Sequence, residues 1–315
     1  MGRVVVTGSF NVDHVWHCQA LPEPGATLAG RYASGPGGKG FNQAVAARRA
    51  GADTALVCAL GDDDGGALAR RLASADGIAL HAHVATQPTG TAGIFVDAGG
   101  RNSIVIGAGA NAALDVAHVQ AKEGLIAAAD VLLVQLESPS ESIAAALGIA
   151  RKAGVRTMLN PAPANASTDP ELLALATVLT PNETEFAALL ARHAGIGVDA
   201  AAVAGMDDTT LHALCRRLHP GGSVVLTLGA AGSFASHPED SAMVFDDASF
   251  VRMAAEPARC IDSTGAGDAF NGALCAAWAA HPAQPFRQHL GFASRYAARA
   301  TEAEGAAAAM PWMPA

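Results

Sequence analysis

The residues best suited to chemistry lie in one loop of small residues, Asp262-Ser263-Thr264-Gly265-Ala266-Gly267-Asp268, followed by an apolar run over residues 269–280. This pattern predicts a loop that leads into the N-terminus of a helix. The first N–H groups of a helix have no partner within it, and the aligned peptide dipoles add partial positive charge there. Glycine also lets a phosphate approach the backbone closely. The loop therefore predicts an anion hole at Gly265, Ala266 and Gly267.

Asp268 stands beside this expected anion hole, where a carboxylate would repel a bound phosphate. A carboxylate in that place is suited to a different task, which is to take the proton from a hydroxyl group that attacks the phosphate. Aspartate also caps helix N-termini well. The loop alone thus leaves two interpretations of Asp268, a general base and a helix cap.

Residues 35–42 form a second glycine-rich segment, in which Lys39 lies between Gly38 and Gly40. The segment departs from a P-loop at two fixed positions, because Ala33 takes the place of the first glycine and Gly40 that of the Ser or Thr. The loop at Gly265 likewise lacks the third glycine of a dinucleotide fingerprint, since Phe270 stands there. A Rossmann dehydrogenase is therefore a minor alternative.

The same segment carries groups that suit sugar hydroxyls. Lys39 offers an ammonium group and Asn42 an amide, while Asn11 and Asp13 follow the first expected strand. Together they supply the donors and acceptors of a polyol pocket. Taken by itself, the segment favours a glycine-rich turn with a solvated Lys39 over a polyol pocket.

Three further polar residues stand at the ends of expected elements. Asn182 and Glu185 are three residues apart at a helix start, so they can hold waters around a magnesium–phosphate complex or form a capping box. Glu137 follows an apolar strand, where an unpaired charge is costly. Its position favours a hydroxyl-rich ligand or a nearby cation.

These residues are far apart in the sequence, so a scaffold must bring them together. Short apolar runs alternate with helical patterns, which predicts an α/β fold: a doubly wound, mostly parallel sheet with helices on both faces and a site at the strand ends. Expected strands cover residues 4–8, 56–61, 131–136, 155–159, 178–180, 224–228, 233–236 and 250–254. Expected helices cover residues 42–49, 67–74, 115–129, 171–176, 209–218 and 269–280, with two more that begin at capping boxes at Ser138 and Asn182.

Residues 89–96 and 103–106 interrupt this alternation. The two β-rich runs flank Gly99-Gly100 and predict an antiparallel hairpin. We assign the hairpin to a small β-sheet lid formed by parts of residues 12–36 and 88–107, although residues 21–34 have an irregular pattern. Residues 195–208 are interpreted as a surface insertion, and the chain 1–315 as a single domain with one large core.

Composition excludes several classes of protein. Half of the residues are hydrophobic and 16% are charged, which is typical of a globular domain. The net charge of −9 argues against a nucleic-acid partner. No apolar run reaches the roughly 18 residues of a membrane span, and no signal-peptide layout precedes the first strand. Five scattered cysteines without a CxxC pair predict reduced thiols and a cytoplasmic location.

The order and spacing of these motifs resemble those of the ribokinase-type (phosphofructokinase-B) carbohydrate kinases. The resemblance covers nearly the whole chain, through residues 8–14, 37–44, 107–111, 135–139, 160–164, 181–185, 227–229 and 262–272. It implies a doubly wound αβα sandwich with a small β-sheet lid that often serves as the dimer interface. The implied lid matches the hairpin expected over residues 89–106.

The resemblance also implies roles for individual residues. Asp268 becomes the general base, with Gly265, Ala266 and Gly267 as the anion hole. The implied sugar contacts are Asn11, Asp13, Gly38, Lys39, Asn42, Glu137 and Asp268. The implied nucleotide site contains Asn182, Glu185, Thr227, Gly229, Gly232, Gly267 and Ser294, with Asn182 and Glu185 at the magnesium end. The implied potassium site contains Asp262, Thr264, Ala300, Ala303, Gly305 and Ala309.

Three positions depart from the family pattern. Ala309 stands where the family supplies a serine oxygen to the cation, and Ser294 where a histidine or asparagine is commoner. Phe41 replaces a small residue in the sugar loop, and we expect it to narrow the pocket.

The resemblance implies an ATP-dependent kinase that phosphorylates the 5-hydroxyl of D-ribose, uses Mg²⁺ and K⁺, and forms a homodimer through the lid. A kinase for 2-deoxyribose, fructose or a nucleoside is an alternative within the same class. An alternative of a different class is a sugar-binding regulator that has lost phosphotransfer.

Overall fold

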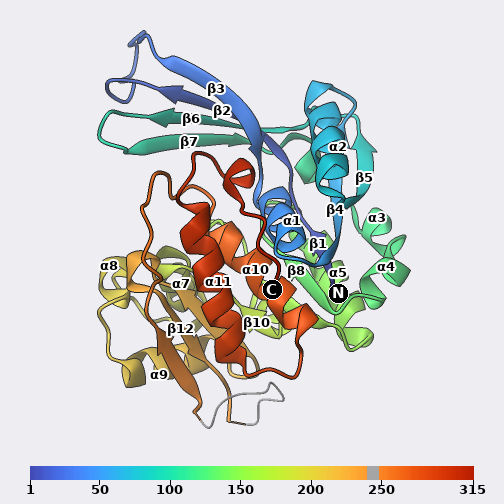
Figure 1. The fold of residues 1–315 in the computed structure, drawn as a ribbon, viewed down its shortest axis with the longest axis vertical. Helices are drawn as coiled ribbons and strands as arrows, with labels where there is room; N and C mark the ends of the chain where they lie inside the picture. The colour runs from blue at the N-terminus through green and yellow to red at the C-terminus, as the bar shows by residue number, and fades with distance from the viewer. Residues whose placement is uncertain (240–247) are drawn as a thin grey trace.

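The computed structural model describes residues 1–239 and 248–315, which form a large sheet flanked by helices and a small separate sheet (Figure 1). The large sheet has the strand order β13-β12-β11-β10-β9-β8-β1-β4-β5. Its strands are β1 (Arg3–Thr7), β4 (Asp53–Gly61), β5 (Ala79–Ala85), β8 (Val131–Val134), β9 (Arg156–Leu159), β10 (Val178–Leu179), β11 (Ser223–Thr227), β12 (Ser233–Ser236) and β13 (Phe250–Met253). From β11 through β10, β9, β8, β1 and β4 to β5, each strand pairs in parallel with its neighbour. Strand β12 is antiparallel to β11, and β13 is antiparallel to β12. The doubly wound, mostly parallel sheet is confirmed.

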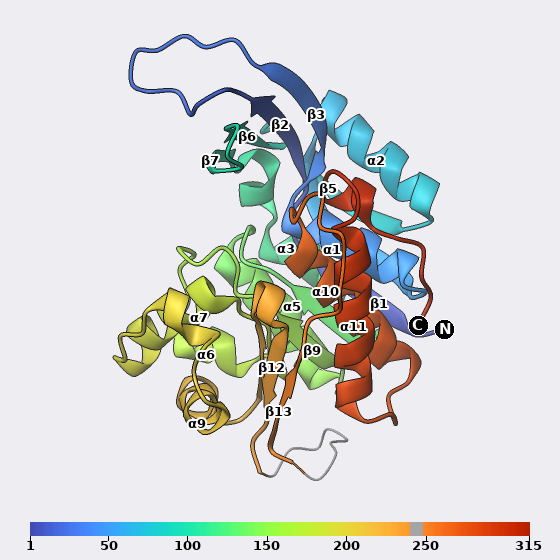
Figure 2. The same cartoon turned by 60° about the vertical axis from the view of Figure 1, so that its left-hand side comes forward.

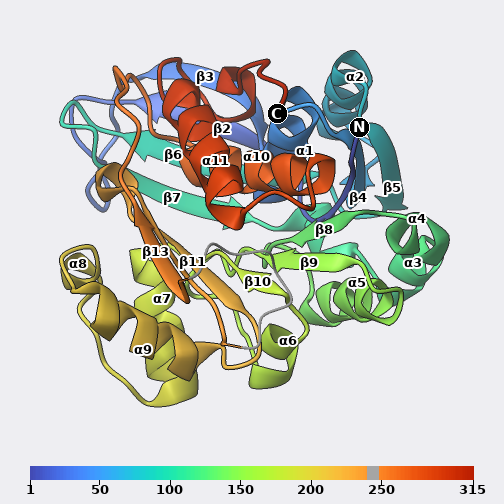
Figure 3. The same ribbon diagram turned by 60° about the horizontal axis from the view of Figure 1, so that its bottom comes forward.

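Two hydrophobic cores lie on opposite faces of this sheet. Side chains alternate between the faces of a strand, so Val4 and Val6 of β1 belong to one core and Val5 to the other. Figure 3 shows the two helical layers. The first layer contains α1 (Lys39–Arg49), α2 (Asp64–Asp76), α10 (Ala266–Ala280) and α11 (Phe286–Ala300). The second contains α3 (Val116–Gln120), α4 (Glu123–Ala127), α5 (Ser140–Lys152), α6 (Pro170–Ala174), α7 (Glu183–Leu189), α8 (Ala200–Val203) and α9 (Asp208–Leu218).

Helix α10 is the element that positions the site, and it is buried along almost its whole length from Asp268 to Ala279. A helix that is apolar on all sides belongs inside a core. It packs closely on α1, because a Cβ at Gly272 would lie 2.5 Å from the Ala46 Cβ and from the Gln43 carbonyl oxygen. The starts of α1 and α10 are thereby fixed side by side.

The small sheet forms the lid and stands apart from the large sheet (Figures 1 and 2). Its strand order is β3-β2-β6-β7. The strands are β2 (Asn11–His17), β3 (Arg31–Gly37), β6 (Gly90–Val96) and β7 (Asn102–Gly107). Strands β6 and β7 pair antiparallel, as the hairpin pattern predicts, and β2 pairs parallel to β6. On the lid, the Trp16 ring stacks on the Phe95 ring and contacts the Tyr32 ring, with centroids 5.3 and 5.2 Å apart.

Several local expectations differ from the structure. Residues 31–34, expected to be irregular, lie in β3, because β2 supplies their hydrogen-bond partners. The helix expected over residues 115–129 is divided into α3 and α4, and β5 lies outside the expected strands. Helix α5 begins after Pro139 without a side-chain cap, so the capping box expected at Ser138 is wrong.

The remaining described turns include short helical segments. They are η1 (Gly109–Ala113), the π-helical η2 (Leu190–Ala194), η3 (Gly229–Ala231) and η4 (Ala307–Ala309). Residues 195–208 contain α8, and Val203 is fully buried in the second core. That segment is therefore part of the packed domain rather than a simple surface insertion. Within the described ranges, no helix has the length and apolar character needed to cross a membrane.

Candidate active site

Asp268 lies in the first turn of α10, directly after the small-residue loop. The helix begins at Ala266, and Gly265 precedes it in a left-handed conformation with φ of 76°. Asp268 is 7% exposed, and its carboxylate turns toward α1. Its Oδ2 accepts a hydrogen bond of 2.9 Å from Asn42 Nδ2, and its Oδ1 accepts one of 2.8 Å from Gln43 Nε2. The helix-cap interpretation is wrong, because side chains of another helix hold both oxygens.

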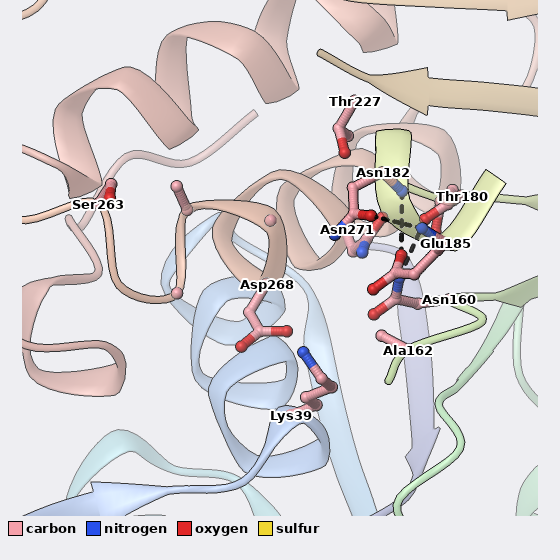
Figure 4. A pocket seen from close by; sticks show the side chains of 13 residues that line it. Lys39, Asn160, Ala162, Thr180, Asn182, Glu185, Thr227, Ser263, Asp268 and Asn271 are labelled. Carbon is pink, nitrogen blue, oxygen red and sulfur yellow. Dashed lines mark hydrogen bonds between the residues drawn. The ribbon is translucent and has the colours of Figure 1, made fainter. Parts of the chain in front are cut away.

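Lys39 faces Asp268 across the site from the start of α1 (Figure 4). Burial acts to lower the pKa of Lys39, but the nearby carboxylates of Asp268, Glu137 and Glu185 outweigh it, so the pKa is raised. Lys39 is therefore a firmly charged ammonium group among three acids. The alternative of a solvated lysine in a turn is wrong, since Lys39 opens a helix and is only partly exposed.

Asp13 on the lid strand β2 lies close enough to Glu137 and Asp268 for their charges to raise its pKa. Burial, then Glu137, then Asp268 raise the pKa of Asp13 to about 7. The carboxyl group packs over Gly37, where a Cβ would lie 2.2 Å from the Asp13 carboxylate atoms. Asp13, Glu137, Asp268 and Lys39 thus lie close enough for their charges to act on one another where the lid strand β2 meets the body.

Glu137 is held by the polypeptide itself as well as by charge. Its Oε2 accepts a hydrogen bond of 2.9 Å from the Lys39 main-chain N–H and one of 2.5 Å from Ser9 Oγ. Ser9 Oγ in turn accepts from the Gly40 N–H at 3.2 Å. The place of Glu137 in the sequence predicts a hydroxyl-rich ligand or a cation nearby. The structure adds Ser9, whose part in the site no local pattern indicated.

Asn11 opens β2 and is anchored to the body of the domain. Asn111 Nδ2 donates to Asn11 Oδ1 at 2.8 Å, and the Asn111 amide also pairs with the Phe10 N–H and carbonyl groups. Gly38 lies beside this strand with φ of 86°, and a Cβ there would lie 2.8 Å from the Asn11 nitrogen. The predicted sugar contacts from β2 and α1 therefore converge.

Phe41 does not narrow the expected sugar pocket. Its side chain is 1% exposed and packs edge-on against the Phe10 ring, with centroids 5.1 Å apart, inside the first hydrophobic core. The expectation of a narrower pocket is wrong, because the residue points into the core.

A cavity of about 170 Å³ lies between Lys39 and the start of α7 (Figure 4). Asn182 and Glu185 form a reciprocal capping box there, with hydrogen bonds of 2.8 and 2.9 Å. The pKa of Glu185 is raised, chiefly by burial, although the Asn182 N–H and Lys39 act in the opposite direction. Thr180 Oγ1 and Asn271 Oδ1 are buried without a hydrogen-bond partner, and both residues line the cavity.

This donor set fits a hydrated magnesium ion. Mg²⁺ takes oxygen ligands, keeps several waters and needs few protein groups. The carboxylate of Glu185 and the two unpartnered oxygens supply acceptors for such waters. The capping box and the magnesium interpretation of Asn182 and Glu185 are thus compatible, since Glu185 uses one carboxylate oxygen for the cap.

A larger cavity of about 710 Å³ adjoins the first one. The two share Asn182, Thr227, Ser263, Ala266 and Gly267. The larger cavity brings together the predicted Thr227, Gly229, Gly232, Gly267 and Ser294. It is also lined by residues that no sequence signal indicated, among them Ala255, Pro257, Cys260, Phe270 and Ala297. Its size and apolar walls suit a nucleotide whose phosphates reach the start of α10.

The expected potassium residues are partly assembled. Asp262 accepts hydrogen bonds from the Thr264 N–H at 2.9 Å and the Gly305 N–H at 2.8 Å. Burial opposes ionisation of Asp262, but these hydrogen bonds lower its pKa. Ala300 ends α11 and Ala309 ends η4, with Ala303 in the turn between them. The alanines can offer carbonyl oxygens alone, and across residues 1–239 and 248–315 no cluster of three His, Cys, Asp or Glu residues suits a metal.

Comparison with known sequences gives a consistent result. The profile of the family described as pfkB family carbohydrate kinase matches residues 1–313. Ribokinase of Haemophilus influenzae is 37% identical over 313 residues, which cover 98% of this chain and 95% of the relative. A bifunctional ribokinase/ribose-5-phosphate isomerase A of Fructilactobacillus sanfranciscensis is 39% identical over 280 residues, or 87% of this chain. The match covers 48% of that bifunctional protein, so the chain spans about half its length.

Solved structures share the same fold. Ribokinase from Giardia lamblia superposes with a TM-score of 0.86 at 28% identity, covering 98% of this chain and 96% of that one. Ribokinase of Arabidopsis thaliana, complexed with ribose and ATP, gives a TM-score of 0.81 at 26% identity, covering 99% and 96%.

Proposed function

Because this chain belongs to the pfkB family of carbohydrate kinases, we propose that it transfers the γ-phosphoryl group of ATP to the 5-hydroxyl of D-ribose. The observation that carries the proposal is the placement of Asp268. Its carboxylate is held by two amides at the start of α10, and it lines with Lys39 the smaller cavity, which adjoins the cavity of nucleotide size. The plant relative solved with ribose and ATP supports both substrates.

The sugar would bind in the space between β2 and α1. Asn11, Asp13 and Glu137 present acceptors to its hydroxyl groups, while Lys39 and Asn42 present donors. Neutral hydroxyls suit this space better than an anionic sugar, because three carboxylates face a single ammonium group. Closure of the lid over the sugar would exclude water from the reacting groups.

Asp268 would accept the proton of the 5-hydroxyl as that oxygen attacks the phosphoryl group. The N–H groups of Gly265, Ala266 and Gly267 would receive the negative charge that develops on the transferring group. Asn182 and Glu185 would hold the waters of Mg²⁺, which when bound neutralises phosphate charge. Thr227, Gly229, Gly232 and Ser294 would contact the nucleotide.

Three further properties belong to the proposal. K⁺ would bind through Asp262, Thr264, Gly305 and the carbonyls of Ala300, Ala303 and Ala309, where Asp262 already joins the two segments. The protein would form a homodimer through the lid, whose edge strand β7 is fully exposed. All five cysteines are free thiols, which supports a cytoplasmic location.

The test is coupled ADP release from ATP and Mg²⁺ with D-ribose, 2-deoxyribose, fructose and adenosine in parallel, each with and without K⁺. We expect ribose to exceed the others in kcat/KM by about an order of magnitude, because a hydrogen-bonding site rejects analogues that lack a hydroxyl. A higher kcat/KM for another acceptor would reject ribose but keep the kinase. Ribose binding without ADP release from any acceptor would favour the regulator.

A further inference from the structure

A buried chain of side-chain amides lies behind Asp268 and has no role in the reaction described so far. Gln43 of α1 donates from Nε2 to Asp268 Oδ1 at 2.8 Å and to Asn160 Oδ1 at 3.0 Å. Gln135, just after β8, donates from Nε2 to Gln43 Oε1. Asn160, just after β9, donates from Nδ2 to the Thr180 carbonyl at 2.9 Å. The chain thus joins α1, α10 and the ends of neighbouring strands.

The directions of these hydrogen bonds leave Gln43 a single orientation. Both of its N–H bonds are used, one toward Asp268 and one toward Asn160, and its oxygen accepts from Gln135. The opposite orientation would place its oxygen against the Asp268 carboxylate and its N–H groups against those of Gln135. The Thr180 carbonyl, which can only accept, fixes the far end of the chain.

The surroundings of Gln43 are too tight for the network to rearrange. Gln43 is 0% exposed, and Gln135 and Asn160 are also buried. A Cβ at Gly8 would lie 2.1 Å from Gln135 Oε1, so the glycine makes room for that amide. On the other side, Gly272 of α10 lies against the Gln43 carbonyl oxygen. Leaving a buried amide without its hydrogen-bond partner is unfavourable in free energy, so the amides of this chain are expected to keep their orientations.

We propose that Gln43 is a positioning residue, which fixes the Asp268 carboxylate for proton transfer without itself touching the sugar or ATP. The inference rests on the proposed function of Asp268. Asn42 and Gln43 are adjacent on α1 and hold the two carboxylate oxygens separately, one each. Asn42 is also an expected sugar contact, whereas Gln43 lines neither cavity and reaches the smaller one only through Asp268 and Asn160.

The experiment compares Gln43→Met with wild type, using whichever acceptor the wild-type enzyme prefers. Methionine nearly preserves volume and removes every hydrogen bond of the amide. We expect kcat to fall about 10- to 100-fold, because a small misplacement of a catalytic group costs that much. The KM values for sugar and ATP should stay within about threefold, since binding groups are untouched. Ser142→Ala is the control: it removes a buried hydrogen bond to the Leu114 carbonyl outside the site and should leave kcat unchanged.

Two comparisons separate positioning from general damage. If Gln43 acts through Asp268, adding Gln43→Met to Asp268→Asn should slow the enzyme by no more than about twofold. A full multiplicative loss in the double variant, or an unchanged kcat in Gln43→Met alone, would overturn the proposal. If Gln43→Met does not fold, Gln135→Leu removes the donor to Gln43 Oε1 and should lower kcat about 3- to 10-fold, again without adding to Asp268→Asn. An unchanged kcat in Gln135→Leu would also contradict the positioning role of Gln43.

The wild-type assay keeps this inference separate from the proposed function. If the wild-type enzyme prefers a sugar other than ribose, the proposed substrate is wrong. The kcat ratios between the Gln43 variants and wild type still test the positioning role with the preferred sugar. A wild-type protein that transfers phosphate to none of the four acceptors would overturn both.

Discussion

Asp268 receives its orientation from α1, a helix more than 200 positions away in the sequence, since Asn42 and Gln43 hold its two oxygens. The loop pattern was enough to predict both an anion hole and a candidate base. It could not choose between a base and a helix cap, because that choice depends on which long-range partners the carboxylate finds. The contacts of Gln43, Asn160 and Ser9 in the site could not be predicted for the same reason, since a single buried amide or hydroxyl has no local sequence signature.

Replacing Asp268 by Asn should lower kcat by about 100-fold or more, because general-base catalysis supplies that much. Sugar binding should change little, since the amide keeps a similar size and one acceptor. Steady-state kinetics and sugar titration check the two effects. Asp64→Asn is the matched control, as it alters another first-turn aspartate on α2, away from the site. Near-normal turnover of the Asp268 variant would reject the role.

Asp13 should make stability depend on pH. Its pKa is about 7 in the folded protein against 3.8 for the unfolded chain, so the folded state binds the extra proton between these values. Stability contributed by this group is present below the unfolded pKa and decreases as pH rises toward 7. Asp13→Asn removes this effect, and its Tm should exceed that of wild type by a few °C at pH 8.

The difference in Tm should shrink as the pH falls toward 4, where Asp13 is neutral in the folded state and begins to take up its proton in the unfolded chain as well. Thermal unfolding of both proteins at pH 4.5, 6 and 8 checks the trend. A difference that is constant across the three pH values would show that Asp13 does not titrate in this range.

At the scale of elements, periodicity and glycine positions predicted most strands and helices of the large sheet and the hairpin of the lid. Failures occurred where partners decide the conformation. Residues 31–34 become a strand because β2 lies beside them, and α5 starts at Ser140, after Pro139, without the expected cap. The expectation that Phe41 narrows the sugar pocket was also wrong, because the ring packs on Phe10 in the core.

The contact between α1 and α10 should tolerate no added methyl group. Gly272→Ala would place a Cβ 2.5 Å from the Ala46 Cβ and the Gln43 carbonyl oxygen. We expect a loss of about 1 to 3 kcal/mol in the free energy of unfolding, typical of overpacking. Chemical denaturation measures it.

Gly148→Ala provides the matched control for that substitution. Gly148 lies inside α5, and a Cβ there would meet nothing within 4 Å. Alanine is the better helix former by about 1 kcal/mol, so this variant should be as stable as wild type or more stable. Equal losses in both variants would show that tight packing at Gly272 is not the cause.

At the scale of the whole molecule, the lid is the part with an exposed apolar edge. Strand β7 has the consecutive residues Ile104, Val105 and Ile106, which point to alternate faces and are 50%, 68% and 48% exposed. An exposed apolar edge strand is a ready site for pairing with another chain. This supports the proposed homodimer, in which a second lid would cover β7.

Val105→Glu should weaken that dimer by about tenfold or more, because an unpaired carboxylate would be buried at the interface. Sedimentation velocity over a range of concentrations measures the change. Val84→Glu is the control, since Val84 is 56% exposed on β5, the edge strand of the large sheet. A wild-type protein that stays monomeric throughout, or an equal effect of both substitutions, would argue against dimerisation through the lid.

The strand β2 belongs to the lid sheet, whereas Asp268 and its amide supports belong to the packed body. In the proposed site, the lid therefore contributes two of the sugar contacts, Asn11 and Asp13, whereas the body contributes the others together with the proposed base. Laboratory evolution toward a new sugar can vary β2, β3 and the connection between them (Figure 2) while the base and anion hole stay intact. On this proposal, changes in the lid would alter the acceptor while leaving the proposed transfer step on the body in place.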